Sequence, residues 1–214
     1  STLDGTLQPS LFYKAKGCQR PLLVDLHTWS FNRFNQIENM LPYAEKYDFN
    51  LLLPEFRGSN TLSNKNCTYA CGSEYAKRDI KDAIDYVIGA EGVDPDNVFL
   101  LGLSGGGHMA LLMAGMCPEY FKAIGAFVPI TDLVKWAEEK ARKDKLWKVE
   151  ATVPNEWTDA VHFDLRDIPH NYVENVGKYT LFNFYCATQK ESAKVRDILA
   201  QYEVKYFVSE SKTL

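Results

Sequence analysis

The stretch Val98-Phe99-Leu100-Leu101-Gly102-Leu103-Ser104-Gly105-Gly106-Gly107-His108-Met109-Ala110-Leu111-Leu112-Met113-Ala114 joins two different patterns without a linker. Residues 98–103 are almost continuously apolar, which is typical of a strand buried on both faces. Residues 105–114 follow at once and are typical of a helix. Ser104 lies at the junction, with a glycine two positions before it and another two positions after it. This spacing predicts a tight turn from strand to helix, because larger neighbours would collide there.

The predicted turn would expose the hydroxyl group of Ser104, which bears on its reactivity. A serine hydroxyl is a weak nucleophile, so an enzyme must expose it, place a base beside it and prepare a site for the oxyanion that forms after attack. The turn exposes the hydroxyl, and the N–H of Gly105 is expected to point into the oxyanion site at the positive end of the helix. We therefore interpret Ser104 as a nucleophile. The alternative is a glycine-rich turn that packs tightly or holds a phosphate, but the motif lacks the Lys-Ser/Thr ending of a phosphate loop.

The rest of the chain alternates short apolar runs with longer amphipathic ones. Apolar positions at helical spacing predict a helix over residues 76–88, and Thr188 with Glu191 is typical of a capping box that starts another. This order is typical of a mostly parallel sheet with helices on its faces, here within a single domain over residues 1–214. The predicted strands are residues 22–26, 50–53, 98–103, 123–128, 161–165, 179–185 and 204–208. The charged segment 135–148 is expected to be a solvated helical face or an excursion above the sheet.

Composition excludes several classes of function. The chain of 214 residues is 46% hydrophobic, enough for one large core, and its net charge of -4 makes nucleic acid a poor candidate for a partner. No apolar run approaches the roughly 20 residues that cross a bilayer. Five cysteines without zinc spacing predict no structural metal, and no cofactor motif is present. Cys67 and Cys71 either form a local disulfide in an oxidising compartment or remain thiols in a loop, so the compartment stays open.

Several motifs together resemble a known family over roughly residues 20 to 135. They are Pro54-Glu55-Phe56-Arg57-Gly58-Ser59, the helix with Asp79 and Asp82, Asp94-Pro95-Asp96-Asn97-Val98, Gly102-Leu103-Ser104-Gly105-Gly106-Gly107-His108, Pro118-Glu119-Tyr120-Phe121-Lys122-Ala123 and Pro129-Ile130-Thr131-Asp132. In this order they are similar to the prolyl oligopeptidase-like branch of α/β-hydrolases. The resemblance implies the α/β-hydrolase fold, with Ser104 in a nucleophile elbow. That branch includes peptidases and carboxylesterases, among them esterases that remove acyl groups from plant polysaccharides.

The resemblance also implies the second oxyanion donor. The segment Leu26-His27-Thr28-Trp29-Ser30 takes the place of the family's His-Gly segment, so the backbone N–H of Thr28 or Trp29 is the expected donor beside Gly105. Thr28 replaces the family's glycine. His27 is expected to hold this loop by a hydrogen bond rather than to act as a base. His108, four positions after Ser104, is expected to be a packing or hydrogen-bonding residue.

The positions of the catalytic acid and base depart from the arrangement that the family resemblance implies. The family places its acid just after a late strand and its histidine after the last strand, yet residues 208–214 contain no histidine. If residues 179–185 are the penultimate strand, the acid is missing too. If residues 161–165 are the late strand, Asp167 follows it directly as the acid and His170 as the base. The alternative is that both are ordinary polar residues of a loop. Asp132 is another candidate acid, although it also suits the first turn of a helix.

The sequence leaves three functional hypotheses. The first is a carboxylesterase that transfers an acyl group to Ser104 from a small-molecule or polysaccharide ester. The second is a relative that has lost its acid and base and acts as a binding protein. The third is a peptidase. Four aromatic residues are expected near the mouth of the site, where they either stack on sugars or aryl groups or simply pack in the core and rim: Trp29, Phe31, Phe34 and Phe56.

Overall fold

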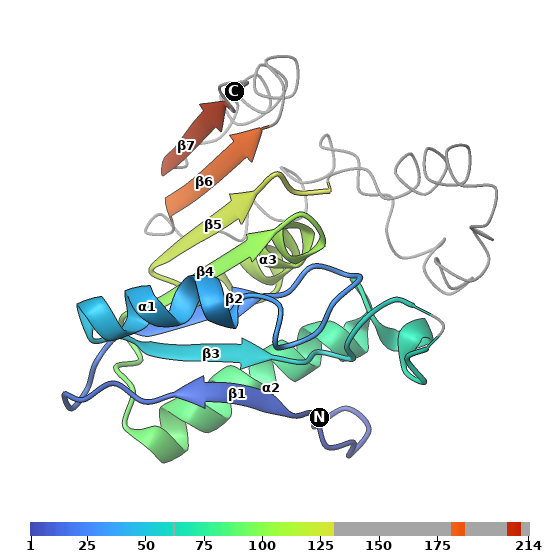
Figure 1. Cartoon of the computed structure of the whole chain (residues 1–214), viewed down its shortest axis with the longest axis horizontal. Coiled ribbons are helices and arrows are strands. Elements are labelled where there is room, and N and C mark those ends of the chain that lie inside the picture. Colours follow the sequence, from blue (N-terminus) through green and yellow to red (C-terminus); the bar gives the residue numbers. More distant parts are fainter. Residues whose placement is uncertain (62, 131–180, 187–204, 211–214) are drawn as a thin grey trace.

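A single sheet organises the computed structural model, which describes residues 1–61, 63–130, 181–186 and 205–210 (Figure 1). Its described strands follow the order β1-β3-β2-β4-β5-β6-β7. Among these described strands, only β1 runs antiparallel to its neighbour, and the other pairs are parallel. The strands are β1 (Ser10–Tyr13), β2 (Leu22–Leu26), β3 (Asn50–Pro54), β4 (Val98–Leu103), β5 (Ala123–Phe127), β6 (Leu181–Cys186) and β7 (Lys205–Glu210).

The strand order creates a switch point between β2 and β4. From β2 the chain moves to β3 on one side, and it later returns to place β4 on the other side. The register pairs Leu26 with Gly102 and Leu103 with Phe127, so the carboxyl ends of β2, β4 and β5 lie together at one edge of the sheet. In open α/β sheets, ligands bind outside the carboxyl ends of the strands at such a switch point. The fold therefore places the end of β4 where a site is expected.

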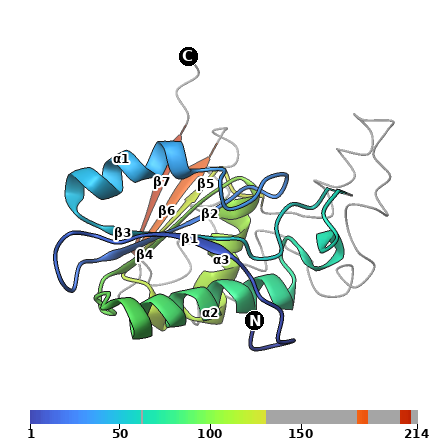
Figure 2. The same cartoon turned by 60° about the horizontal axis from the view of Figure 1, so that its bottom comes forward.

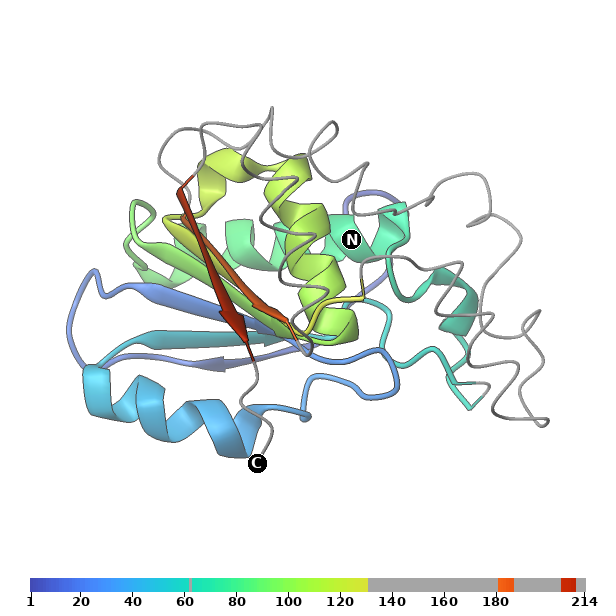
Figure 3. The same cartoon turned by 90° about the horizontal axis from the view of Figure 1, so that it is seen from above.

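Helices cover both faces of the sheet. Helix α1 (Ile37–Tyr47) lies on one face, and α2 (Glu74–Glu91) and α3 (Gly105–Met116) lie on the other (Figures 2 and 3). Two short 3-10 helices, η1 (Cys67–Tyr69) and η2 (Pro118–Tyr120), lie in the connections. The main core joins β2 and β4 to α2 and α3, and a smaller one joins β2 and β3 to α1. None of the described helices combines the length and the apolar composition that a membrane crossing requires.

The predicted elements agree with the structure wherever burial is strong. The predicted α/β-hydrolase architecture, a mostly parallel sheet with helices on both faces, is confirmed, and β6 and β7 match the predicted strands 179–185 and 204–208. Helix α2 extends the predicted helix 76–88 at both ends, because the Ser73 hydroxyl caps it and Gly92 ends it at a φ of 67°. The sequence analysis missed β1 and α1. Residues 135–148 and 161–165 and the predicted helix at Thr188 lie outside the described residues.

A buried carboxyl group interrupts the apolar face under α1. Asp25 lies in β2, two residues after Leu23, so both side chains point to the same face of the sheet. Leu23 packs there with Ala44 of α1 and Leu51 of β3. Burial raises the pKa of Asp25 from 3.8 to about 7, although the backbone N–H of Leu26 opposes the shift. The folded protein therefore retains a proton that the unfolded chain releases.

Because of this proton, we expect the free energy of unfolding to decline as the pH rises. Between about pH 4 and pH 7 the folded state binds the proton and the unfolded state does not, so the free energy of unfolding falls as the pH rises and levels off above pH 7. Asp25→Asn should remove roughly 1 to 4 kcal/mol of this decline. Urea unfolding of both proteins at pH 4, 5, 6, 7 and 8 measures it. Parallel pH profiles for the two proteins would contradict the prediction.

Candidate active site

Ser104 occupies a strained turn between β4 and α3. Its backbone has a φ of 55° and a ψ of -113°, a conformation that residues other than glycine rarely adopt. The Ser104 N–H donates to the carbonyl oxygen of Phe127 at the end of β5, at 2.9 Å. Its carbonyl oxygen accepts the N–H of His108 in α3 at 3.0 Å. This combination of strand, strained serine and helix is the geometry of a nucleophile elbow.

Glycines allow the elbow to close. A Cβ atom at Gly102 would overlap the carbonyl oxygen of Gly106, and a Cβ atom at Gly106 would overlap the carbonyl oxygen of Leu26. Both overlaps involve backbone atoms, which cannot rotate away as a side chain can. The structure therefore agrees with the predicted need for small residues on both sides of Ser104. It also shows why residue 106 must be small: α3 begins in direct contact with the end of β2.

Replacing Gly106 by alanine should be severely destabilising. Because the obstacle is the backbone of β2, we expect Gly106→Ala to lower the free energy of unfolding by about 3 kcal/mol or more. Gly89→Ala is the matched control, since no atom lies within 4 Å of a Cβ atom at Gly89 in α2. The control should gain about 0.5 to 1 kcal/mol from helix propensity. Urea denaturation measures both, and equal stabilities would show that the elbow tolerates a side chain.

His27 fixes the loop that follows β2. The imidazole is buried, and its Nδ1 and Nε2 atoms each lie 2.8 Å from a backbone carbonyl oxygen, that of Thr28 and that of Glu55 respectively. The ring also stacks on Phe56 with centroids 3.9 Å apart. Burial lowers the pKa of His27, while the two carbonyl groups oppose the shift. These contacts agree with the predicted loop-holding role.

The same loop contains the two predicted oxyanion donors, Thr28 and Trp29. The N–H of Thr28 donates to Oδ1 of Asn35 at 3.1 Å, so it is engaged within the loop. Trp29 is buried against the elbow, and a Cβ atom at Gly105 would lie 2.5 Å from its indole ring. Gly105 begins α3, where the first N–H groups of a helix lack partners within the helix. Gly105 and Trp29 remain predicted donors, and the N–H of Thr28 already has a partner in Asn35.

His108 lies behind the elbow as a buried neutral imidazole. Its Nδ1 is 2.6 Å from the carbonyl oxygen of Ile130, and its ring meets Trp29 edge-on with centroids 5.1 Å apart. Burial lowers the pKa of His108 to about 4, so the ring is uncharged at neutral pH. His108 thus serves packing and hydrogen bonding, as the sequence indicated.

The acid and the base are not among the groups that the structure places. The predicted acid Asp167, the predicted base His170 and the other candidate acid Asp132 lie outside the described residues. Strand β6 lies between β5 and β7, so residues 181–186 occupy the penultimate position of the described sheet. Residues 186–190, which follow, contain no carboxylate. Asp167 and His170 therefore remain predictions.

An ion pair that the sequence analysis did not identify anchors the neighbouring loop. Arg57 is buried, and its Nε lies 2.6 Å from Oδ2 of Asp79 while its Nη1 lies 2.9 Å from Oδ2 of Asp4. Burial opposes the charge, but the two carboxylates hold the pKa of Arg57 above its usual value. Three residues later, the N–H of Asn60 donates to the carbonyl oxygen of Trp29 at 2.7 Å. The ion pair therefore supports the predicted oxyanion loop, residues 26–30. Arg57 and Asp79 both lie in motifs that carry the family resemblance, but the sequence did not show that they pair.

Breaking this ion pair should be far more costly than breaking an exposed one. Arg57→Met leaves the buried carboxylate of Asp79 without its cation, so we expect a loss of about 3 to 5 kcal/mol in the free energy of unfolding. Lys14→Met removes an exposed pair with Glu91 and should cost less than about 1 kcal/mol. Urea unfolding at pH 7 compares them. A loss for Arg57→Met as small as that of the control would show that the pair adds little.

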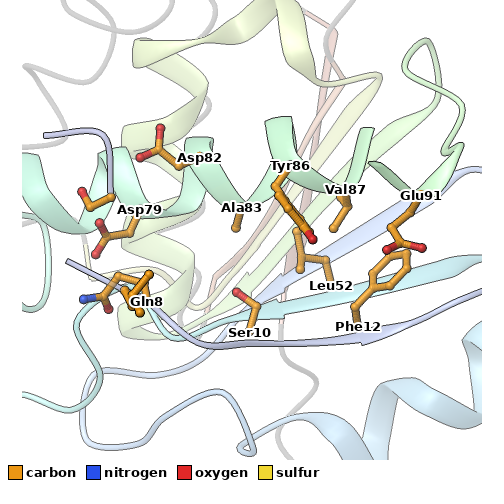
Figure 4. A pocket seen from close by; sticks show the side chains of 12 residues that line it. Gln8, Ser10, Phe12, Leu52, Asp79, Asp82, Ala83, Tyr86, Val87 and Glu91 are labelled. Atoms are coloured by element: carbon orange, nitrogen blue, oxygen red, sulfur yellow. The ribbon is translucent and has the colours of Figure 1, made fainter. Parts of the chain in front are cut away.

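Two other features do not form part of the site. A groove of about 420 Å³ between β1 and α2 is lined by Phe12, Asp82 and Tyr86 among others, and it includes none of the predicted site residues (Figure 4). Cys18, Cys67, Cys71 and Cys117 are free thiols, so the disulfide considered for Cys67 and Cys71 is not formed. Within the described part of the chain, no cluster of His, Cys, Asp or Glu residues has the arrangement of a metal site.

Comparisons with solved structures show which proteins share this fold. An acylaminoacyl peptidase of Pyrococcus horikoshii is 16% identical with a TM-score of 0.67, and the match covers 97% of this chain but 35% of that one. The fluorophosphonate-binding serine hydrolase F of Staphylococcus aureus is 16% identical with a TM-score of 0.67, over 95% of this chain and 89% of that one. An acetyl xylan esterase from Paenibacillus sp. R4 is 18% identical with a TM-score of 0.66, over 99% and 75%. The chain thus spans about a third of the peptidase.

Sequence comparison identifies the family. A search of curated proteins finds no significant match. The model of the prolyl oligopeptidase family matches residues 35–188, a range that includes the elbow and the loop with Arg57. The family resemblance noted from the sequence motifs is therefore confirmed. The chain belongs to the prolyl oligopeptidase family of serine hydrolases.

Proposed function

We propose that this protein is a carboxylesterase in which Ser104 is the nucleophile. The observation that carries the proposal is the strained backbone of Ser104 at the carboxyl end of β4, next to the switch point of the sheet. The N-terminus of α3 and the loop of His27 meet at this serine and supply the backbone groups that an oxyanion needs. The likeness of the fold to an acetyl xylan esterase supports an ester as the substrate.

The proposed reaction proceeds by acyl transfer. The hydroxyl oxygen of Ser104 attacks the ester carbonyl carbon, and a base accepts the hydroxyl proton. The N–H groups of Gly105 and Trp29 stabilise the resulting oxyanion. When this intermediate collapses, the bond between the carbonyl carbon and the alcohol oxygen breaks. The alcohol takes the proton from the base and departs, and the acyl group stays on Ser104. Water then releases the acid and restores the serine. We assign the base to His170 and the orienting acid to Asp167, and the substrate is a small-molecule or polysaccharide ester.

Removing the nucleophile should abolish activity without unfolding the protein. Ser104→Ala should lower the hydrolysis of p-nitrophenyl acetate at least about a thousandfold, because no other group takes over the attack. A fluorophosphonate probe should label the wild type once, at Ser104, and leave Ser104→Ala unlabelled. His170→Ala should also lose activity, and retention of full activity by this variant would refute its assignment as the base.

The same measurements separate the alternatives. A wild-type protein that neither hydrolyses p-nitrophenyl acetate nor reacts with the probe would refute the esterase proposal and favour a binding protein. The likeness to an acylaminoacyl peptidase makes peptide cleavage the second candidate. Faster Ser104-dependent hydrolysis of acylated peptides than of esters would establish that candidate instead.

A further inference from the structure

The four aromatic residues expected near the mouth of the site fall into two groups. Trp29 and Phe56 are 3% and 0% exposed and belong to the core. Phe31 and Phe34 are 56% and 52% exposed, in the loop that connects β2 to α1. Only Phe31 and Phe34 therefore present their rings to solvent. Large apolar side chains that are exposed together on a soluble protein often mark a binding surface.

Phe31 and Phe34 are held in place before any ligand arrives. The N–H of Phe31 donates to the carbonyl oxygen of Thr28 at 3.0 Å, and the N–H of Phe34 donates to Oδ1 of Asn32 at 3.1 Å. Between them, Arg33 binds the Glu55 carboxylate through its backbone N–H and its guanidinium, at 3.1 and 2.9 Å. The guanidinium carbon lies 4.5 Å from the centre of the Phe34 ring. A surface that is already ordered loses little entropy when it binds.

The polar groups beside these rings suit an uncharged, hydroxyl-rich ligand. Asn32, Gln36 and Asn39 carry side-chain amides, which both donate and accept hydrogen bonds. Asn39 donates to Gln36 at 3.0 Å and so helps to order this group. The charge of Arg33 is balanced by Glu55, so Arg33 is not a free cation that would draw an anionic ligand to the loop. Aromatic rings with amides between them match the alternating apolar and hydroxyl-bearing faces of a sugar chain.

Helix α1 follows the loop in the chain and carries two further exposed aromatic residues. Tyr43 and Tyr47 are 58% and 57% exposed. Together with Asn39 they recur every four residues, so the three side chains share one face of the helix. From Asn39 to Tyr47 this face extends about 12 Å. Exposed aromatic residues therefore occur from the loop along α1, as a ligand with several repeating units would require.

The loop also lies beside the nucleophile. Its first residues contact the elbow, because the carbonyl oxygens of Leu26 and His27 pack against Gly106 and the indole of Trp29 packs against Gly105. Phe31 is joined to this part of the loop by its hydrogen bond to Thr28. The backbone that carries Phe31 is therefore anchored to the elbow, and we expect a chain bound on Phe31 and Phe34 to extend toward Ser104.

We propose that Phe31 and Phe34, continued by Tyr43 and Tyr47, form a platform that binds the carbohydrate chain of an acylated polysaccharide. The placement of the platform beside a working nucleophile rests on the proposed esterase function. The binding of carbohydrate by the platform does not, so the two can be tested separately.

Binding is measured first, in the Ser104→Ala background, where no hydrolysis changes the ligand. The probe is water-soluble acetylated xylan. Its binding is measured by affinity electrophoresis and by calorimetry. The double substitution Phe31→Ala and Phe34→Ala should weaken binding about tenfold or more, as expected for the loss of two stacking contacts. Tyr86→Ala is the control, because Tyr86 is an equally exposed aromatic residue, 68% exposed, but lies on α2 on the opposite face of the sheet. It should bind as tightly as its parent.

Activity provides the second readout, in the protein with Ser104 intact. The double substitution should lower kcat/KM for acetylated xylan at least tenfold more than for p-nitrophenyl acetate. Unchanged xylan binding in the double variant, or an equal loss in Tyr86→Ala, would overturn the platform. An equal fall for the polymer and the small ester would overturn it too, because it would indicate an acyl or aryl subsite or a damaged oxyanion loop. If the wild type binds xylan through these residues but hydrolyses no ester, the platform stands and the esterase function fails.

Discussion

The first turn of α3 packs directly against the carboxyl end of β2, and the rest of the site depends on this contact. It exists only because residue 106 has no Cβ atom that would meet the carbonyl oxygen of Leu26. Ser104 takes its strained conformation beside this contact, and the helix N-terminus lies next to the loop of His27. Trp29 then covers Gly105. One backbone approach thus brings together the proposed nucleophile and the proposed oxyanion donors.

Glu55 connects the loops around that contact. Its carbonyl oxygen meets the ring of His27, and its carboxylate binds Arg33. Two residues later, Arg57 joins the same segment to Asp79 of α2 through a buried ion pair. The end of β3 therefore contacts the connection between β2 and α1 at two places, at His27 and at Arg33 between the two exposed phenylalanines. A rigid arrangement of this kind is what electrostatic stabilisation of an oxyanion requires, because its donors must be in place before the charge forms.

The segment that identifies the family and the loop proposed to contact the substrate are different parts of this molecule. Strand β4, the elbow and α3 hold the proposed nucleophile, whereas the loop between β2 and α1 carries the exposed aromatic residues of the proposed platform. Loops on a rigid scaffold commonly provide specificity. The exposed Phe31 and Phe34 lie in such a loop, beside neutral amides.

The sequence by itself determined the buried strands, the elbow and the family. Nearly continuous apolar runs such as residues 22–26 and 98–103 have no stable place except inside a sheet, and glycine spacing around Ser104 permits few other turns. It could not reveal β1, a four-residue edge strand that is only partly buried, or α1, which contains Pro42. It also could not show that Asn35 accepts the N–H of Thr28, or separate the buried Trp29 and Phe56 from the exposed Phe31 and Phe34. Only the tertiary structure decided these points, because burial and hydrogen-bond partners come from segments distant in the sequence.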